Sequence, residues 1–288
     1  MGVNVCQMVT ERIIAELEQG SIPWQKPWTG VRSGAYSYAT GKPYSLLNQM
    51  ILRRPGAYLT FKQVSAAGGC VRKGEKAQFV VFWKPFEVVE EDADGNPIRK
   101  TVPLLRYYHV FHIDQCDGVK EKIASEELKP LDPIAEAEAI LTDYIQRSGC
   151  PIIHEKIDQA YYSPSRDQIH LPLMEQFRNV PEYYSTAFHE CIHSTGHEKR
   201  LARLTKTAHF GNEEYSKEEL VAEIGSAVLM NDLSIETTSS FRNSAAYIQS
   251  WLRALRDDSR LIVSAAGKAE KAVRYLLNEQ PAKSMLSA

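Results

Sequence analysis

Cysteines are scarce in this sequence, and their spacing does not suggest pairs. The 288 residues contain five cysteines: Cys6, Cys70, Cys116, Cys150 and Cys191. Their number is odd and no two form a CxxC motif, which argues against a disulfide framework and against a thiolate zinc site. We therefore expect reduced thiols and a cytoplasmic protein.

Long hydrophobic runs are also missing. No apolar stretch approaches the length of about 18 residues that a membrane-spanning helix needs. The opening stretch MGVNVCQMVTERII lacks the basic start, apolar core and cleavage site of a secretory leader. A membrane is therefore not among the partners that we expect.

Acidic residues are almost absent from one long segment. The whole chain has a net charge of −2, but residues 20–84 contain ten Lys or Arg and a single acid, Glu75. That segment carries about +9 and the rest of the chain about −11. Such an uneven division indicates two surfaces with different tasks.

Hydrophobic periodicity predicts both helices and strands in the N-terminal part. Apolar residues at helical spacing predict an amphipathic helix over residues 9–19 and a second helix over residues 45–54. Two β-rich runs, residues 77–89 and 104–114, flank an Asp-Gly turn. These runs predict the two arms of a long hairpin.

A charged segment separates this part from the rest. Residues 118–133 are poor in aromatics and end in two prolines, so we divide the chain into domains 1–118 and 134–288 with a linker at 119–133. In the second domain we expect short strands around a turn at 163–167, and helices over 134–149, 181–196, 216–230, 244–255 and 265–277. The helix at 216–230 starts with a capping-box pattern at Ser216. The fold class is α+β.

An HExxH motif, His189, Glu190 and His193, lies in a predicted helix. Histidines four residues apart project from one helix face, so both imidazoles can bind one metal ion while the glutamate reaches a metal-bound water. A zinc ion lowers the pKa of such a water to about 7, which suits Glu190 as a general base in hydrolysis. Zn²⁺ is the expected metal, with another divalent ion as the alternative. Unrelated helices also carry this pentapeptide, so the motif alone does not establish a metal site. A catalytic zinc site usually has three protein ligands, and we therefore look for a third.

That third ligand is expected downstream. The extended pattern HExxHxxGxxH fails because Lys199 stands where its last histidine belongs. A continuous helix would place His197 too far along its axis, so His197 could be a ligand only if the helix broke at Gly196, and we expect it near the site or on the surface. The later helix offers Glu218, Glu219 and Glu223. The last two share a helix face, and we predict Glu219 as the ligand and Glu223 as the carboxylate that orients a histidine. The opposite assignment of these two is the alternative.

The stretch DQIHLP, residues 167–172, is predicted to be an exposed edge strand beside the motif helix. An extended peptide substrate could add to such an edge as a further strand. An ordinary edge strand without a ligand is the alternative interpretation.

Ten aromatic residues lie within the basic segment 20–84. Single-stranded nucleic acid is bound by a positive groove that follows the phosphates and by flat side chains on which bases stack. We expect about half of these aromatics to be core residues, but a purely solvated face would mix both charge signs. The candidate DNA-binding residues are Trp24, Lys26, Trp28, Arg32, Tyr36, Tyr38, Lys42, Tyr44, Arg72, Lys73 and Lys76.

Long strings in both parts of the chain resemble the ArdC antirestriction proteins. The N-terminal single-stranded-DNA-binding domain of that family, also found in plasmid TraC-type primases, is similar to VTERIIAELEQGSIPWQKPW, YSLLNQMIL, YLTFKQVSAAGGCVRKGEKAQFVVFW and YYHVFHIDQCDG. The zincin-type metallopeptidase domain that follows it in ArdC is similar to AFHECIHSTGHEKRL and EELVAEIGSA. The resemblance covers nearly the whole chain.

This resemblance implies a DNA-binding module followed by a zincin-like domain of gluzincin type. It implies a protein of a plasmid, phage or integrative element that binds incoming single-stranded DNA and helps it escape host restriction. His189 and His193 are then metal ligands with a glutamate of the later helix, and Glu190 is the catalytic glutamate. The expected reaction is peptide-bond hydrolysis, with a host protein such as a restriction component as substrate.

Two other functions remain open. One is a DNA-shielding protein whose metal is only structural, and the other is a replication accessory that acts with a primase or relaxase. Hydrolysis requires Glu190, whereas shielding does not.

Overall fold

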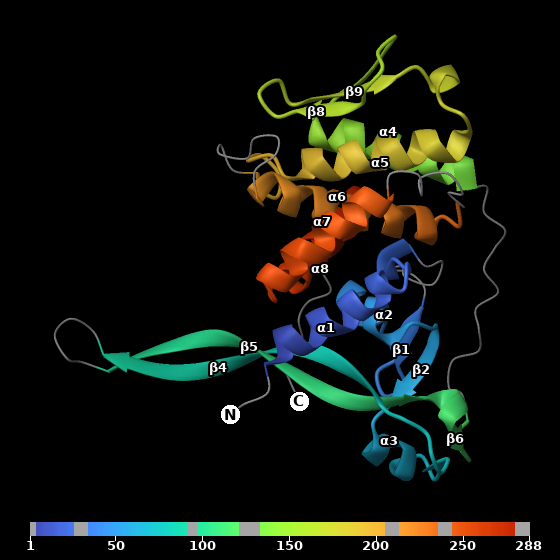
Figure 1. The fold of residues 1–288 in the computed structure, drawn as a ribbon, viewed down its shortest axis with the longest axis vertical. Coiled ribbons are helices and arrows are strands. Elements are labelled where there is room, and N and C mark those ends of the chain that lie inside the picture. The colour runs from blue at the N-terminus through green and yellow to red at the C-terminus, as the bar shows by residue number, and fades with distance from the viewer. Residues whose placement is uncertain are drawn as a thin grey trace.

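A computed structural model of the chain shows the helical C-terminal part stacked on the N-terminal part (Figure 1). The structure describes residues 4–25, 34–91, 97–120, 133–204, 213–235 and 244–279. Within these ranges no helix is long and apolar enough to span a membrane. The fold is mixed α+β, as the sequence predicts.

Helix α1 (Val5–Glu18) is the predicted amphipathic opening helix. Asn4 caps it, because its side chain accepts a hydrogen bond from the backbone N–H of Gln7 at 3.2 Å. Gly20 follows at a φ of +73°, a conformation that favours glycine, and ends the helical course. The buried face of the helix includes Val9, Ile13 and Leu17.

A four-stranded sheet and two short helices complete the N-terminal part. Its elements are the short 3₁₀ turn η1 (Pro23–Gln25), β1 (Ala35–Ser37), α2 (Leu46–Leu52), β2 (Gly56–Leu59), α3 (Phe61–Ala66), β3 (Cys70–Val71), β4 (Gln78–Glu91), β5 (Pro97–His112), η2 (Ile113–Gln115) and β6 (Cys116–Asp117). The strand order is β1-β2-β5-β4, and β3 pairs separately with β6.

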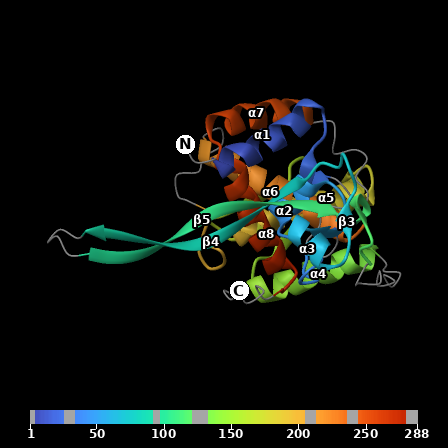
Figure 2. The ribbon, with the colours of Figure 1, turned by 90° about the horizontal axis from the view of Figure 1, so that it is seen from below.

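Strands β4 and β5 form the predicted long hairpin. They pair antiparallel from Gln78 opposite Val110 to Glu91 opposite Pro97, and the predicted Asp-Gly turn lies outside the described residues. Only the root of the hairpin pairs with β2, so its outer part is a two-stranded ribbon. The ribbon extends well beyond the body of the molecule (Figures 1 and 2).

The C-terminal part consists of helices and a small sheet. Its elements are α4 (Pro133–Ser148), β7 (Ile152–Glu155), β8 (Tyr161–Ser163), β9 (Gln168–Pro172), η3 (Met174–Gln176), α5 (Val180–Thr195), α6 (Glu213–Asp232), α7 (Ser244–Asp257) and α8 (Leu261–Leu276). The predicted helices of this part are all present, and β8 and β9 flank the predicted turn.

Two local predictions for this part are wrong. Strand β9, which contains most of DQIHLP, is the central strand, because it pairs with β7 on one side and β8 on the other. β7 pairs with residues 169–172 and β8 with residues 168–170, so β9 is not the free edge strand that was predicted. β8 is an edge strand and contacts α5. Ser216 lies inside α6, which begins at Glu213, so Ser216 is not the helix cap.

The two parts share one hydrophobic core. Helix α1 packs beside α7, as the view from below shows (Figure 2), and Trp24 meets Trp251 edge-on with ring centroids 5.3 Å apart. Polar contacts cross the same boundary: Thr10 Oγ1 donates to the carbonyl of Ser259 at 2.8 Å. The buried cluster therefore continues from α1 through α5, α6 and α8. Solution experiments are best done on the full chain.

Candidate metal centre and nucleic-acid surface

Helix α5 sets the position of the HExxH motif. Asn179 caps the helix by accepting a hydrogen bond from the N–H of Glu182 at 2.9 Å, and Pro181 occupies the first turn. His189 and His193 follow on one face, one turn apart. The helix is anchored in the core by fully buried residues, among them Phe188, Cys191 and Ile192.

The side chains of His189, His193 and Glu219 converge on one point. The Nε2 atoms of the two histidines lie 3.1 Å apart. The carboxylate of Glu219 places one oxygen 3.5 Å from Nε2 of His189 and the other 3.3 Å from Nε2 of His193. All three side chains are at most 20% exposed, so the group lies in a partly enclosed site.

Close packing of α6 on α5 brings Glu219 to the histidines. Gly225 of α6 meets Ile192 of α5 so tightly that a Cβ atom at Gly225 would lie 2.8 Å from Ile192 Cδ1. The hydroxyl of Ser226 donates to the carbonyl of Ser185 at 2.7 Å and ties the two helices at the same level. Gly225 and Ser226 are small because α5 and α6 pack closely at this level.

The outer nitrogens of both histidines face carboxylates. Nδ1 of His193 lies 3.3 Å from Oε1 of Glu218, and Nδ1 of His189 lies 3.9 Å from Oε1 of Glu223. A proton on each Nδ1 leaves the lone pair of each Nε2 directed at the shared point. Glu223 was predicted to face a histidine in this way. Glu218 makes the shorter contact, and its role was not predicted.

Arg203 holds Glu218 in place, and sequence reasoning gave no sign of it. Its guanidinium donates to both carboxylate oxygens of Glu218, at 3.0 Å from Nε and 2.8 Å from Nη2. Arg203 follows α5 in a short non-helical segment, and its side chain is 7% exposed. A buried arginine needs a carboxylate partner, but only the structure shows that Arg203 is buried.

These contacts shift the pKa values of the site. Burial is the largest single influence on His193 and disfavours its charged form, but hydrogen bonds to Glu218 and Glu219 outweigh burial and raise its pKa to about 10. Burial likewise raises the pKa of Glu219, but its hydrogen bonds with His189 and His193 prevail and lower it. A divalent ion held by His193 would take the place of the proton on Nε2, so metal binding would release that proton.

The residues present fit a divalent cation. Two nitrogens that each lie about 2.1 Å from a tetrahedral ion are roughly 3.4 Å apart, close to the separation seen here. Two imidazoles, one carboxylate and a water are one of the ligand sets of catalytic zinc sites. Glu190 follows His189 directly in α5 and is only 8% exposed.

His197 lies outside this group. Helix α5 ends at Thr195, and Nδ1 of His197 lies 3.8 Å from Oδ2 of Asp167. Asp167 is also bound by Arg200, whose side chain is 1% exposed. This pair fixes the segment after α5 to the turn between β8 and β9.

The predicted DNA-binding residues divide into three groups. Lys26, Trp28 and Arg32 lie outside the described residues. Lys42, Arg72, Lys73 and Lys76 are exposed, and Tyr36 and Tyr38 are half-buried. Trp24 is 0% exposed and Tyr44 is 8% exposed, so both are core residues here. Because both rings are buried, neither Trp24 nor Tyr44 has a free face on which a base could stack, and neither remains a candidate DNA-binding residue.

Exposed aromatics instead gather on the β4–β5 ribbon. The pairing register puts Val80 opposite Tyr108, Phe82 opposite Arg106 and Lys84 opposite Leu104, so these residues share one face. We call this the ribbon face and define it by Phe82, Lys84, Phe86, Leu104, Arg106 and Tyr108. Phe82, Phe86 and Tyr108 are 44%, 49% and 48% exposed.

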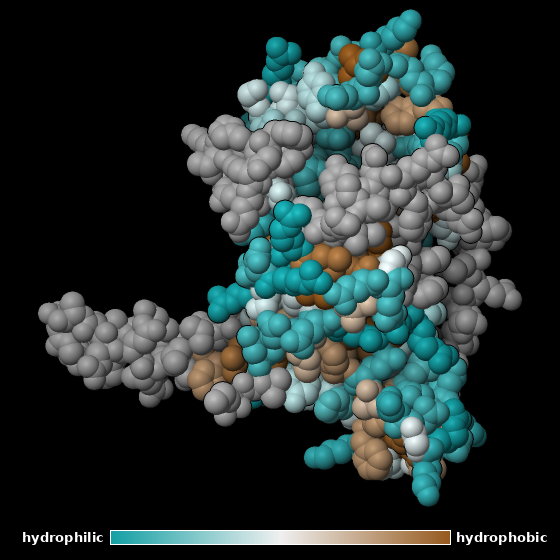
Figure 3. Space-filling view, in the orientation of Figure 1, coloured by the Kyte–Doolittle hydropathy of each residue, from teal (hydrophilic) through white to brown (hydrophobic). Residues whose placement is uncertain are grey.

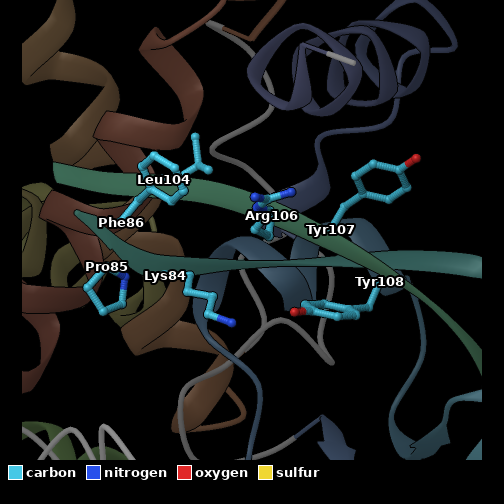
Figure 4. A pocket seen from close by; sticks show the side chains of 7 residues that line it. All are labelled: Lys84, Pro85, Phe86, Leu104, Arg106, Tyr107 and Tyr108. Atoms are coloured by element: carbon cyan, nitrogen blue, oxygen red, sulfur yellow. The ribbon is translucent and has the colours of Figure 1, made fainter. Parts of the chain in front are cut away.

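A cavity of about 410 Å³ is lined by residues of the ribbon face, with Pro85 and Tyr107 (Figure 4). Hydrophobic side chains are visible at the base of the ribbon (Figure 3). This run was predicted to be one arm of a hairpin, and its aromatic residues are not among the candidate DNA-binding residues. The alternation of Phe82, Lys84 and Phe86 was a signal that could have identified an exposed aromatic and basic face.

Two protein-family models match the chain. Residues 3–111 match the N-terminal domain of anti-restriction factor ArdC. Residues 136–268 match a zincin-like metallopeptidase. The second match contains the His189, His193 and Glu219 group.

Relatives are similar to this chain over nearly all of its length. A DNA primase TraC of Escherichia coli is 39% identical over 94% of this chain, which spans only about a quarter (27%) of that protein. The uncharacterized protein y4eC of Sinorhizobium fredii (strain NBRC 101917 / NGR234) is 32% identical, and the match covers 96% of this chain and 92% of y4eC.

Solved structures are similar as well. The Mn(II)-bound crystal structure of the antirestriction ArdC protein from the R388 plasmid has a TM-score of 0.75 at 36% identity and covers 96% of this chain and 98% of that one. Its metal-free structure has a TM-score of 0.72 at 35% identity and covers 97% and 100%.

Proposed function

This chain belongs to the ArdC family of antirestriction proteins, and from that premise we propose that it binds single-stranded DNA of a mobile element and helps that DNA escape host restriction. We further propose that its C-terminal part is a zinc-dependent peptidase that acts on a host protein such as a restriction component. The convergence of His189, His193 and Glu219 beside Glu190 is the observation that carries the proposal.

The residues of the centre have separate tasks in peptide hydrolysis. A bound divalent ion supplies a water of lowered pKa and an electrophile for the scissile carbonyl. Glu190 takes the proton from the attacking water as the C–O bond forms, and then passes it to the leaving nitrogen, so that the C–N bond breaks and the amine departs neutral. Glu218 keeps the imidazole of His193 oriented through its outer nitrogen, and Glu223 places a negative charge 3.9 Å from the outer nitrogen of His189.

Zinc is the metal that we propose. Two imidazoles and one carboxylate suit Zn²⁺, and Mn²⁺ is the alternative because carboxylates also bind it and because the R388 protein has a Mn(II)-bound structure. Elemental analysis of protein purified without added metal distinguishes the two.

The DNA-binding part of the proposal is supported by exposed residues of the N-terminal part. The ribbon face alternates aromatic and basic side chains, and Lys42, Lys73 and Lys76 are exposed on the same part of the chain. Flat rings that accept bases and cations that accept phosphates are the two requirements for binding single strands without sequence preference.

A replication accessory is a second candidate, favoured by the similarity to TraC primases. Because the chain spans about a quarter of those proteins, their primase activity does not transfer to it. This candidate predicts a protein partner from the replication machinery and no dependence on Glu190.

One experiment tests both parts of the proposal. The full chain is titrated into a fluorescent oligothymidylate over a series of salt concentrations, and its metal content is measured in parallel. We expect an affinity that falls steeply with salt, because phosphate contacts release counterions, and about one zinc ion per chain. A flat salt response contradicts the DNA-binding part, and protein that retains no divalent ion contradicts the peptidase part.

A further inference from the structure

A second cavity, of about 840 Å³, lies where the two parts of the chain meet. The ribbon contributes Trp83, Leu104 and Leu105, and helix α6 contributes Lys217 and Val221. The start of α8 contributes further lining residues, among them Arg260, Leu261 and Lys268. We call this the junction cavity, because neither part of the chain forms it alone.

The inner face of the ribbon is the face opposite the ribbon face, and it carries Val81, Trp83 and Leu105. Trp83 is unusual on this face because its side chain is largely exposed. It pairs directly with Leu105, and Val81 lies two residues before it on the same face. Leu105 and Val81 are 8% and 4% exposed, whereas Trp83 is 58% exposed. The inner face is thus buried up to the point where the ribbon leaves the body, and there it presents a large uncovered ring to the cavity.

The charge of the cavity is uneven. Among its lining residues in the described part of the chain are the cations Lys217, Arg260 and Lys268, against one acid, Asp258. The remaining lining residues are mostly apolar, such as Val5, Val221 and Val263. A ligand that matches this surface has a flat apolar part and a negative charge close to it, and a nucleotide of a single strand has both.

On these grounds, and resting on the DNA binding proposed above, we propose that the junction cavity holds a nucleotide of the bound single strand. Its base stacks on Trp83, and its neighbouring phosphates are neutralised by Lys217, Arg260 and Lys268. The DNA-binding surface then does not belong to the N-terminal part alone, because α6 and α8 complete it.

This placement puts DNA against the helix that builds the metal centre. Lys217 directly precedes Glu218, and Val221 comes two residues after Glu219 in the same helix α6. Single-stranded DNA in the junction cavity therefore contacts α6, the same helix whose Glu219 faces the two histidines. The bound DNA and the metal centre share one helix.

The test uses the full chain and a fluorescent oligothymidylate. Trp83→Ala is expected to bind roughly 5- to 150-fold more weakly, the loss of one stacked base, and Trp83→Phe to retain most of the affinity. Arg260→Ala and Lys268→Ala are each expected to lower the slope of log affinity against log salt by about 0.7. Phe61→Ala and Lys199→Ala serve as matched controls, because both side chains are exposed outside the cavity.

The outcomes separate this inference from the function on which it rests. If the wild-type chain does not bind the oligonucleotide, both the DNA binding and the junction cavity are overturned. If it binds and all three alanine variants bind equally well with unchanged salt slopes, only the junction cavity is overturned. The two cation variants keep the test decisive even if Trp83→Ala does not fold, because both side chains are exposed.

Discussion

Arg203 and Glu218 form a two-pronged ion pair beside the metal centre. Nε and Nη2 of Arg203 donate to the two carboxylate oxygens at 3.0 and 2.8 Å, and Glu218 in turn faces Nδ1 of His193. Arg203 also donates to the hydroxyl of Thr195 at 2.7 Å and to the carbonyl of Ile192. A residue beyond α5 thus fixes a carboxylate of α6 against a histidine of α5.

Replacing Arg203 with Lys should weaken metal binding. Lysine keeps the charge but cannot span both oxygens of Glu218, so His193 loses its fixed orientation. We expect a metal affinity about 10- to 100-fold lower, measured by competition with a chromophoric chelator. Arg147→Lys on the surface of α4 is the control. Equal affinities for both variants would show that the ion pair does not tune the site.

Gly225→Ala should destabilise the fold by separating α5 from α6. The new Cβ atom would lie 2.8 Å from Cδ1 of Ile192, and overpacking of this kind costs about 1–3 kcal/mol. The control is Gly267→Ala in α8, where nothing lies within 4 Å of the new atom. That variant should be stabilised by up to about 1 kcal/mol. Urea unfolding checks both, and two equal effects would contradict the close-packing account.

The Asp167–Arg200 pair should make stability fall in acid. Burial raises the pKa of Asp167, but hydrogen bonds from Arg200 and Tyr162 prevail, so its folded pKa lies below the ordinary value of 3.8. A depressed pKa contributes stability that is complete above 3.8 and is lost as the pH falls through the folded pKa. Asp167→Asn should therefore lower the free energy of unfolding by about 3 kcal/mol at pH 7. Between pH 5 and pH 3 the free energy of unfolding of the variant should fall less steeply than that of the wild type. Urea unfolding over that pH range is the measurement, and parallel curves for the two proteins would refute the linkage.

Trp24→Ala should affect stability and not DNA contacts. Trp24 is fully buried against Trp251, and truncating such a side chain costs about 3–5 kcal/mol. Affinity for an oligothymidylate, measured below the unfolding temperature and corrected for the folded fraction, should equal that of the wild type. A variant of normal stability with weakened DNA binding would restore Trp24 to the candidate DNA-binding residues.

The features that the sequence revealed are local ones. Helical spacing predicts α1, α5 and α8, because apolar residues every three or four positions define one helix face. The HExxH motif is likewise local, since His189 and His193 share a face whatever surrounds the helix. Glu219 was predicted as the ligand because it shares one face of the later helix with Glu223. The structure places the Glu219 carboxylate at the two Nε2 atoms.

The features that it did not reveal depend on partners far along the chain. Trp24 is buried by Trp251 across the boundary between the two parts, and no local pattern carries that contact. The position of β9 between β7 and β8 depends on pairing order, which alternation within a strand does not encode. The start of α6 is a local exception: the capping-box pattern at Ser216 lies within the helix, which begins three residues earlier at Glu213.

The central claim is that hydrolysis at this centre protects entering DNA. The most direct test compares the wild type with Glu190→Gln in restricting cells, by the efficiency with which DNA enters. Glutamine keeps the size of the side chain but cannot accept the proton. We predict that Glu190→Gln loses protection while the purified variant keeps its metal and its affinity for single strands. Full protection by this variant would contradict the claim and leave a DNA-shielding protein whose metal is structural.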